Sequence, residues 1–403
     1  MLKVVLGSAL LAVFAMASES GSGAEFERPP SFSAQNVLGA AVRGANYSVA
    51  RTVPSDGFLR SYTFQTSFGA FSANGDEMAL MRIRELNALD ALDKTTRSQK
   101  FTDAVAKAGL APFDLAGKLA TNPVDAVSDT FSGVGQLLGG VASGVKHIGR
   151  SKDSTLASVT GASKQKRLIA VQLGVDPYTD FRPLAEKLDA LSGYAAAGGI
   201  LVTAAFAVIP GAAGAVISNV STADTLNSMA RDYSPDQLTD ISREKLAKLG
   251  ITGVIADGLL SNSFYTPVDV AAIVDALGRM GNMRGFDVAV AHAASAQSRD
   301  AAYLVRRRVE LTAAYQERTR QLTGFVQPRS LAFPMSTTAD GGIVGVFPFD
   351  CLAWTKDAAR SFTIVSEESK GGAKVIEITG TATALARMRL RALGWIVRER
   401  SPR

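Results

Sequence analysis

Residues 374–398 have the sequence KVIEITGTATALARMRLRALGWIVR, which predicts the architecture of the C-terminal part of the chain. Lys374–Thr379 is an apolar run of the length and composition of a buried strand. Thr381–Leu393 has the periodicity of a helix, and Gly394 follows it as a typical helix stop. Trp395–Arg398 is a second short strand. Because a helix connects the two strands, we expect a βαβ unit in which they are parallel.

The rest of residues 324–403 completes a small α/β module. Residues 330–336 and 343–349 predict a β-hairpin joined at Asp340-Gly341-Gly342, since Asp-Gly between two apolar runs is a common hairpin signal. Residues 356–370 predict a helix between this hairpin and the βαβ unit.

Upstream of the module the apolar spacing is mainly helical. Thr266-Pro267-Val268-Asp269 combines an N-cap, a proline at the first helical position and an acid in the first turn. Residues 43–75 instead alternate between apolar and polar side chains and contain turn residues, so they predict two or three antiparallel strands. The predicted helices cover residues 75–94, 163–173, 182–193, 236–249, 267–281 and 285–322.

These patterns predict a mainly α-helical α+β protein. We expect a small N-terminal β-hairpin unit, a central helical body with a buried Ala/Gly-rich hairpin, and a small C-terminal α/β module. The expected boundaries are 1–17 for a signal peptide, 18–40 for a flexible leader, 41–110 for the β-hairpin unit with helices, 111–323 for the helical body and 324–403 for the α/β module.

The first residues predict export. Lys3 is the only charged residue before Glu19, and the apolar residues 4–17 end in the small side chains Ala15 and Ala17. A short positive region, an apolar region too short to span a bilayer and a small-residue cleavage site define a secretory signal peptide. We therefore expect a cleaved signal and a protein of the periplasm or cell envelope.

Residues 190–223 contain no charged side chain, and Pro210-Gly211 divides them into two halves. The first half is too short to span a bilayer as a helix. Alanine and glycine, which dominate the stretch, contribute little to membrane insertion. A hairpin buried in the helical core is the favoured interpretation, and membrane contact is the alternative.

Overall charge and cysteine content limit the function classes. The 403 residues carry a formal net charge of +6, which favours an anionic membrane surface but lacks the clustering of a nucleic-acid-binding protein. Cys351 is the only cysteine, so no intramolecular disulfide can form. Its apolar surroundings, Phe347–Trp354, predict a buried and unreactive thiol.

The sequence contains no recognisable catalytic, metal or cofactor motif. The two histidines, His147 and His292, and Cys351 lack the spacing of a zinc site, and neither a Gly-x-Ser-x-Gly elbow nor a phosphate-binding loop occurs. Ser163 and Lys166 have Ser-x-x-Lys spacing, but the partner motifs of penicillin-recognising enzymes are missing. We therefore assign no catalytic residue, no metal ligand and no cofactor.

Charged residues at three places have structural interpretations. Asp176 and Asp180, or Glu367 and Glu368, offer carboxylate pairs for glycan hydrolysis, but their settings predict turn caps and a solvated helix end respectively. The triplet Arg306–Arg308 predicts a solvated helix face, with contact to phospholipid headgroups as the alternative.

Several local runs carry a resemblance. Ser163–Asp180 (SKQKRLIAVQLGVDPYTD), the earlier Asn122-Pro-Val-Asp125 and the later Gly394-Trp395 resemble a family of exported hypothetical proteins of proteobacteria, over most of the mature chain. The resemblance implies export and no particular activity. We expect a non-enzymatic structural or adaptor protein that has a protein partner or lies at a membrane surface. A membrane-inserting or pore-forming protein using residues 190–223 and a cell-envelope hydrolase are the alternatives.

Overall fold

The computed structural model describes residues 25–98, 101–103, 106, 161–198, 227–329, 331, 333–369 and 371–400. Several predictions lie outside these residues: the signal peptide, the start of the leader, His147 and most of the apolar 190–223 segment. No helix within the described residues is both long enough and apolar enough to cross a bilayer.

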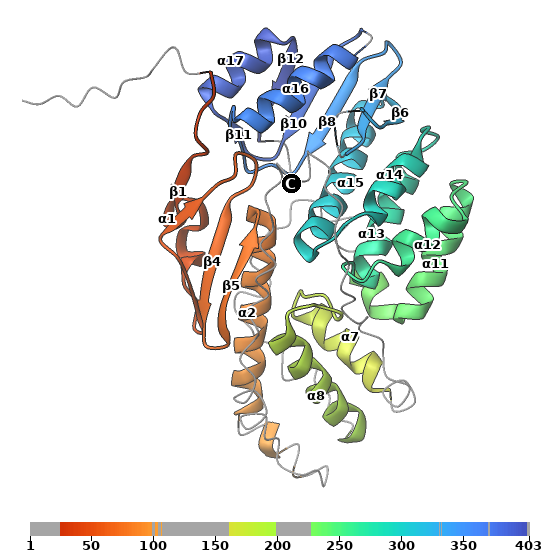
Figure 1. Cartoon of the computed structure of the whole chain (residues 1–403). Helices are drawn as coiled ribbons and strands as arrows, with labels where there is room; N and C mark the ends of the chain where they lie inside the picture. The colour runs from red at the N-terminus through yellow and green to blue at the C-terminus, as the bar shows by residue number, and fades with distance from the viewer. Residues whose placement is uncertain are drawn as a thin grey trace, which may run out of the picture.

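The N-terminal unit consists of short antiparallel strands packed on one long helix (Figure 1). Tyr62 and Phe64 of β4 are fully buried, whereas Thr63 and Gln65, which alternate with them, are exposed. This alternation places one face of the sheet against the apolar side of α2, and the predicted antiparallel strands are confirmed. The elements are β1 (Ser31–Ser33), α1 (Ala34–Leu38), the 3-10 helix η1 (Gly39–Val42), β2 (Tyr47–Val49), β3 (Thr52–Pro54), β4 (Ser61–Thr66), β5 (Gly69–Asn74) and α2 (Asp76–Thr96).

The described residues in the middle of the chain, 161–198 and 227–319, are mainly helical, as predicted. The Thr266 hydroxyl accepts from the backbone of Asp269, and the Asp269 carboxylate accepts from the Thr266 backbone, so a capping box begins α13. The described helices are α7 (Ala162–Gln172), α8 (Arg182–Gly198), α11 (Pro235–Lys248), α12 (Gly253–Ser261), α13 (Pro267–Arg279), α14 (Phe286–Ala294) and α15 (Arg299–Thr319).

The prediction of one helix over residues 285–322 is wrong. The Ser298 side chain accepts from the backbone of Ala301, so this serine begins a new helix, α15, after α14 has ended. At the other end Arg320 adopts a left-handed conformation with φ of 55°, and strand β6 begins at Leu322.

The C-terminal module has a five-stranded sheet in the order β12-β10-β8-β7-β6. β8, β10 and β12 are parallel, and β6, β7 and β8 are antiparallel, which confirms the predicted βαβ unit and hairpin. A smaller parallel pair joins β9 to β11. The elements are β6 (Leu322–Val326), β7 (Met335–Thr338), β8 (Ile343–Phe347), β9 (Cys351–Leu352), α16 (Lys356–Glu368), β10 (Lys374–Ile378), β11 (Thr381–Ala382), α17 (Ala384–Ala392) and β12 (Trp395–Arg398).

The two faces of this sheet pack on different parts of the chain. Phe347 and Ile376 point into a core formed with α16 and α17, whereas Val346 and Val375 point into the core of α13, α14 and α15. Figure 1 shows α16 and α17 on one side of the sheet and α15 on the other. The fold is therefore the predicted mainly helical α+β class.

Candidate functional site

Parallel α/β sheets usually bind ligands beyond the carboxyl ends of their strands. In this chain that position follows Phe347 of β8 and Ile378 of β10. Segments of the same chain occupy that place.

Asp350 is the central side chain at this edge. Its carboxylate is buried and accepts hydrogen bonds from the backbone of Arg60 at 2.9 Å and of Asp76 at 3.0 Å. The second bond satisfies a free N–H at the start of α2. Burial, followed by the nearby Asp76 carboxylate, raises the pKa of Asp350 well above its ordinary value. Asp350 thus joins the C-terminal module to the N-terminal unit.

The backbone around Asp350 makes the same connection. The Phe58 carbonyl accepts from the amides of Asp350 and Cys351 at 2.9 and 3.1 Å, and the Phe58 ring lies 4.9 Å from the Phe349 ring. Gly380 approaches so closely that a Cβ there would lie 1.8 Å from the Asp350 carbonyl oxygen. The carboxyl edge of β8 is therefore occupied by the loop before β4 and by the start of α2.

Asp76 also has partners for its side chain. Its carboxylate accepts from Arg60 Nη1 at 2.7 Å and from the Tyr62 hydroxyl at 2.6 Å. Asn74 next to it donates to Asp300 at the start of α15, at 2.8 Å. The polar groups around Asp350 thus connect the N-terminal unit, the C-terminal module and α15 by hydrogen bonds.

A second group of charges lies where α2, α13, α15 and the loop between α7 and α8 meet, and we call it the charge junction. Arg82 of α2 bonds Glu85 at 2.8 Å and Asp180 of the loop at 2.6 Å. Arg299 of α15 bonds Asp180 at 3.3 Å and Asp269 of α13 at 2.5 Å. Burial opposes ionisation of Asp180, but Arg82 and Arg299 outweigh it and lower its pKa.

Two members of the arginine triplet, Arg306 and Arg307, belong to this junction, so the prediction of a solvated face is wrong. Arg306 bonds the fully buried Asp269 at 2.8 Å and Glu310 at 3.0 Å. Arg307 pairs with Glu310 and with Glu77 of α2. A solvated helix face is ruled out because these guanidinium groups point into the contact between helices.

Arg308 differs from its two neighbours. It donates to the Pro334 carbonyl and lies 4.8 and 4.6 Å from the ring centres of Phe333 and Phe347. No ion pair to a carboxylate forms here within the described residues. Burial lowers the pKa of Arg308 to about 9. Cation–π contact with two rings therefore takes the place of a counter-ion.

Asp176 caps the turn after α7, as predicted, by accepting from the Tyr178 amide at 2.8 Å. It also accepts from the Thr266 hydroxyl at 2.6 Å, so it connects this turn to the start of α13. Burial and the neighbouring Asp269 raise the pKa of Asp176 to about 6. The fold brings Asp176 and Asp180 into one junction, where both have binding partners within the protein.

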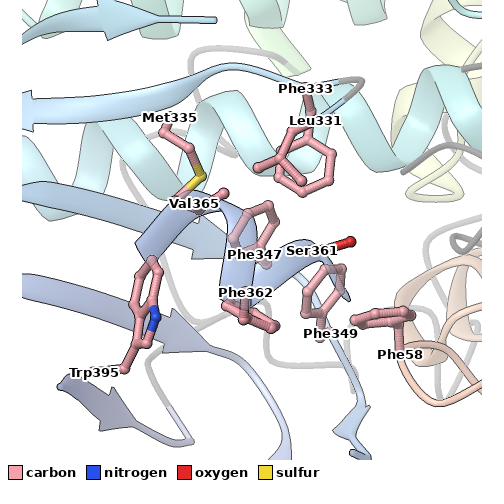
Figure 2. Close-up of a pocket in the computed structure, with 10 residues that line it drawn as sticks. All are labelled: Phe58, Leu331, Phe333, Met335, Phe347, Phe349, Ser361, Phe362, Val365 and Trp395. Atoms are coloured by element: carbon pink, nitrogen blue, oxygen red, sulfur yellow. The ribbon is translucent and has the colours of Figure 1, made fainter. Parts of the chain in front are cut away.

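A pocket lies in the C-terminal module (Figure 2). Ser361 is the one polar residue of its lining, and the free space is about 10 Å³, which is of the order of one water molecule. Figure 2 shows aromatic rings from strands β8 and β12, from helix α16 and from loops around it. The pocket provides no ionisable group for chemistry. Its lining is Phe58, Leu331, Phe333, Met335, Phe347, Phe349, Ser361, Phe362, Val365 and Trp395.

The remaining candidates are structural. Cys351 is buried, as predicted, and its sulfur lies 2.9 Å from the Ser55 hydroxyl. Burial raises its pKa to about 12. Lys166 pairs with Asp189 at 2.7 Å. No group of three His, Cys, Asp or Glu suited to a metal occurs in the described part of the chain.

Glu367 and Glu368 lie at the end of α16, as predicted. Glu367 is exposed, and Glu368 accepts from the Arg329 amide at 3.1 Å. His292 lies in the last turn of α14, within the helical body. The structure therefore brings neither the two C-terminal acids nor this histidine to the charge junction.

The outer surface of α17 is chemically different from these buried groups. Arg387, Arg389 and Arg391 are spaced two residues apart along this helix, which contains no acid. Arg387 pairs with Glu399 at 2.6 Å, whereas neither Arg389 nor Arg391 has an ion pair within the described residues. Met388 between them is 55% exposed.

Neither Asp350 nor the α17 surface is predicted from the sequence, and Asp269 is predicted only as an acid in the first turn of its helix. Asp350 is the single charge in the apolar run Phe347–Trp354, and a lone carboxylate in such a run signals a buried partner elsewhere. A scan against protein-family models and searches of curated proteins and of solved structures give no match for this chain.

Proposed function

We propose that this chain is an exported, non-enzymatic adaptor protein whose parts form one body. The observation that supports this most directly is the carboxyl edge of β8. In an α/β enzyme this position would hold a ligand. Here Asp350 and the Phe58 carbonyl use it to bind the N-terminal unit to the C-terminal module.

The charge junction supports the same proposal. A catalytic acid, base or nucleophile needs a group that is free to bind the substrate. Arg82, Arg299 and Arg306 each bond two carboxylates from different places in the fold. Such ion pairs fix the positions of the helices relative to one another, and breaking one of them leaves a buried charge without a partner.

Enzymatic turnover is the first test. The purified protein would be incubated with cell-wall fragments, phospholipids and glycans, and the products analysed by mass spectrometry. We expect no turnover. Turnover that Asp180→Asn or Asp176→Asn abolishes, while the variant keeps its circular dichroism spectrum, would contradict the proposal and favour a hydrolase.

Fractionation tests localisation and membrane insertion. The full chain with a C-terminal tag would be expressed in a Gram-negative host, and its membranes washed with carbonate at high pH. We expect a processed protein in the periplasm, or on membranes and released by the wash. An unprocessed cytoplasmic chain contradicts export. Retention after the wash contradicts a peripheral protein and favours insertion through residues 190–223.

A further inference from the structure

The structure carries an interaction surface on its last helix, and we infer that this surface binds an anionic lipid bilayer. We call it the α17 surface and define it as the exposed residues Ala384, Met388, Arg391 and Ala392 together with the half-buried Arg387 and Arg389. The inference deepens the proposed adaptor function by assigning it a partner.

Charge is the first argument. Residues 384–400 contain five arginines and one acid, Glu399. Two of these arginines have ion pairs, Arg387 with Glu399 at 2.6 Å and Arg398 with Glu377 at 3.8 Å. Inside the protein the arginines of the charge junction have carboxylate partners, but Arg389 and Arg391 have none within the described residues. A local excess of unpaired arginine attracts an anionic surface.

The exposed apolar side chain of Met388 is the second argument. Ala386 and Leu390 face the core of the module, and the opposite side of α17 exposes Met388. One turn further, Arg391 lies on the same side as Met388, because residues three apart are neighbours on a helix. Arginines beside an outward apolar side chain are characteristic of helices that lie in the headgroup region of a bilayer.

Size favours a bilayer over an acidic protein partner. A helix of nine residues is roughly 14 Å long, and this one exposes a single large apolar side chain. A stable protein interface requires an apolar core and on the order of 1,000 Å² or more of complementary surface. Binding to a bilayer requires no complementary shape, because the free energies of charge attraction and of shallow insertion add along the helix.

The test is sedimentation of the purified exported protein with phosphatidylglycerol/phosphatidylcholine vesicles and with phosphatidylcholine vesicles alone. We expect binding to the anionic vesicles only, and loss of that binding in high salt. Each arginine is expected to change the partition coefficient about fivefold. Arg389→Gln/Arg391→Gln should therefore lower it on the order of 25-fold, and Met388→Gln should lower it further.

The matched control is Arg43→Gln/Arg51→Gln, which removes two exposed arginines from the N-terminal unit and gives the same net charge. We expect near-normal binding from it. An equal loss from both double variants overturns the inference, because net charge alone would then explain binding. Absence of binding to anionic vesicles also overturns it and favours an acidic protein. Neither result touches the adaptor proposal, which only the turnover and fractionation tests can refute.

Discussion

Replacement of Asp350 tests whether its hydrogen bonds or its charge hold the two ends of the chain together. Asp350→Ala leaves the buried amides of Arg60 and Asp76 without an acceptor. An unsatisfied buried donor costs about 1–3 kcal/mol. We therefore expect Asp350→Ala to lower the free energy of unfolding by about 2–6 kcal/mol, a large part of the stability of a typical domain.

Asp350→Asn should behave differently at neutral pH. Asparagine has the same shape, and its carbonyl oxygen can take the place of Oδ2, which accepts both amides. The raised pKa of Asp350 means that its charge is unfavourable in the fold, so removing the charge carries little penalty. We expect Asp350→Asn to lie within about 1 kcal/mol of the wild type.

Urea unfolding followed by circular dichroism at pH 7 measures both variants. Asp240→Ala is the control, since Asp240 is exposed on α11, and such surface changes usually stay within about 0.5 kcal/mol. Equal destabilisation by the alanine and asparagine variants would refute the reasoning, because the charge and not the two hydrogen bonds would then be responsible.

Three further predictions concern single residues. The folded pKa of Asp176, about 6, exceeds its ordinary 3.8, so ionisation of this group destabilises the fold as pH rises from about 4 through 6. The free energy of unfolding of Asp176→Asn, measured in urea titrations, should therefore rise relative to that of the wild type by up to about 3 kcal/mol over that range. A difference that does not change with pH would contradict this. Gly380→Ala should lower the unfolding midpoint strongly because a Cβ meets the Asp350 carbonyl, whereas Gly278→Ala, with no atom within 4 Å, should not. Cys351, with a pKa of about 12, should react with a thiol reagent at least about 1,000-fold more slowly in the native protein than in urea, and rapid native labelling would exclude a buried thiol.

The parts predicted correctly from the sequence depend on local signals. The unit β10–α17–β12 is predicted by the apolar run of β10 and by Gly394, which directly follows the helix. The helix begins at Ala384 and not at Thr381, because Thr381–Ala382 form β11 and the Thr383 side chain caps α17. Local signals also predict α13, where Thr266 and Pro267 mark the start. The division between α14 and α15 also had a local signal, the N-cap Ser298, but the surrounding alanine-rich sequence continues the helical pattern.

The parts that could not be predicted depend on residues far apart in the chain. Asp350 and Asp76 are 274 positions apart, and nothing in either segment identifies the other. Arg306–Arg308 resembles a solvated face because its acceptors, among them Asp269, Glu77 and the Pro334 carbonyl, come from other elements. A charged triplet does not reveal from sequence alone whether its partners are water or buried carboxylates.

Contacts between the two ends also determine the order in which the protein can fold. Glu27 bonds both the backbone of Trp354 and the hydroxyl of Thr383, and Phe58 bonds Asp350 and Cys351. A chain that emerges from its N-terminus makes these contacts only after almost all of it has been synthesised, and closing so long a loop is slow. The contacts of Glu27 and Phe58 therefore stay unformed until the C-terminal module has been synthesised.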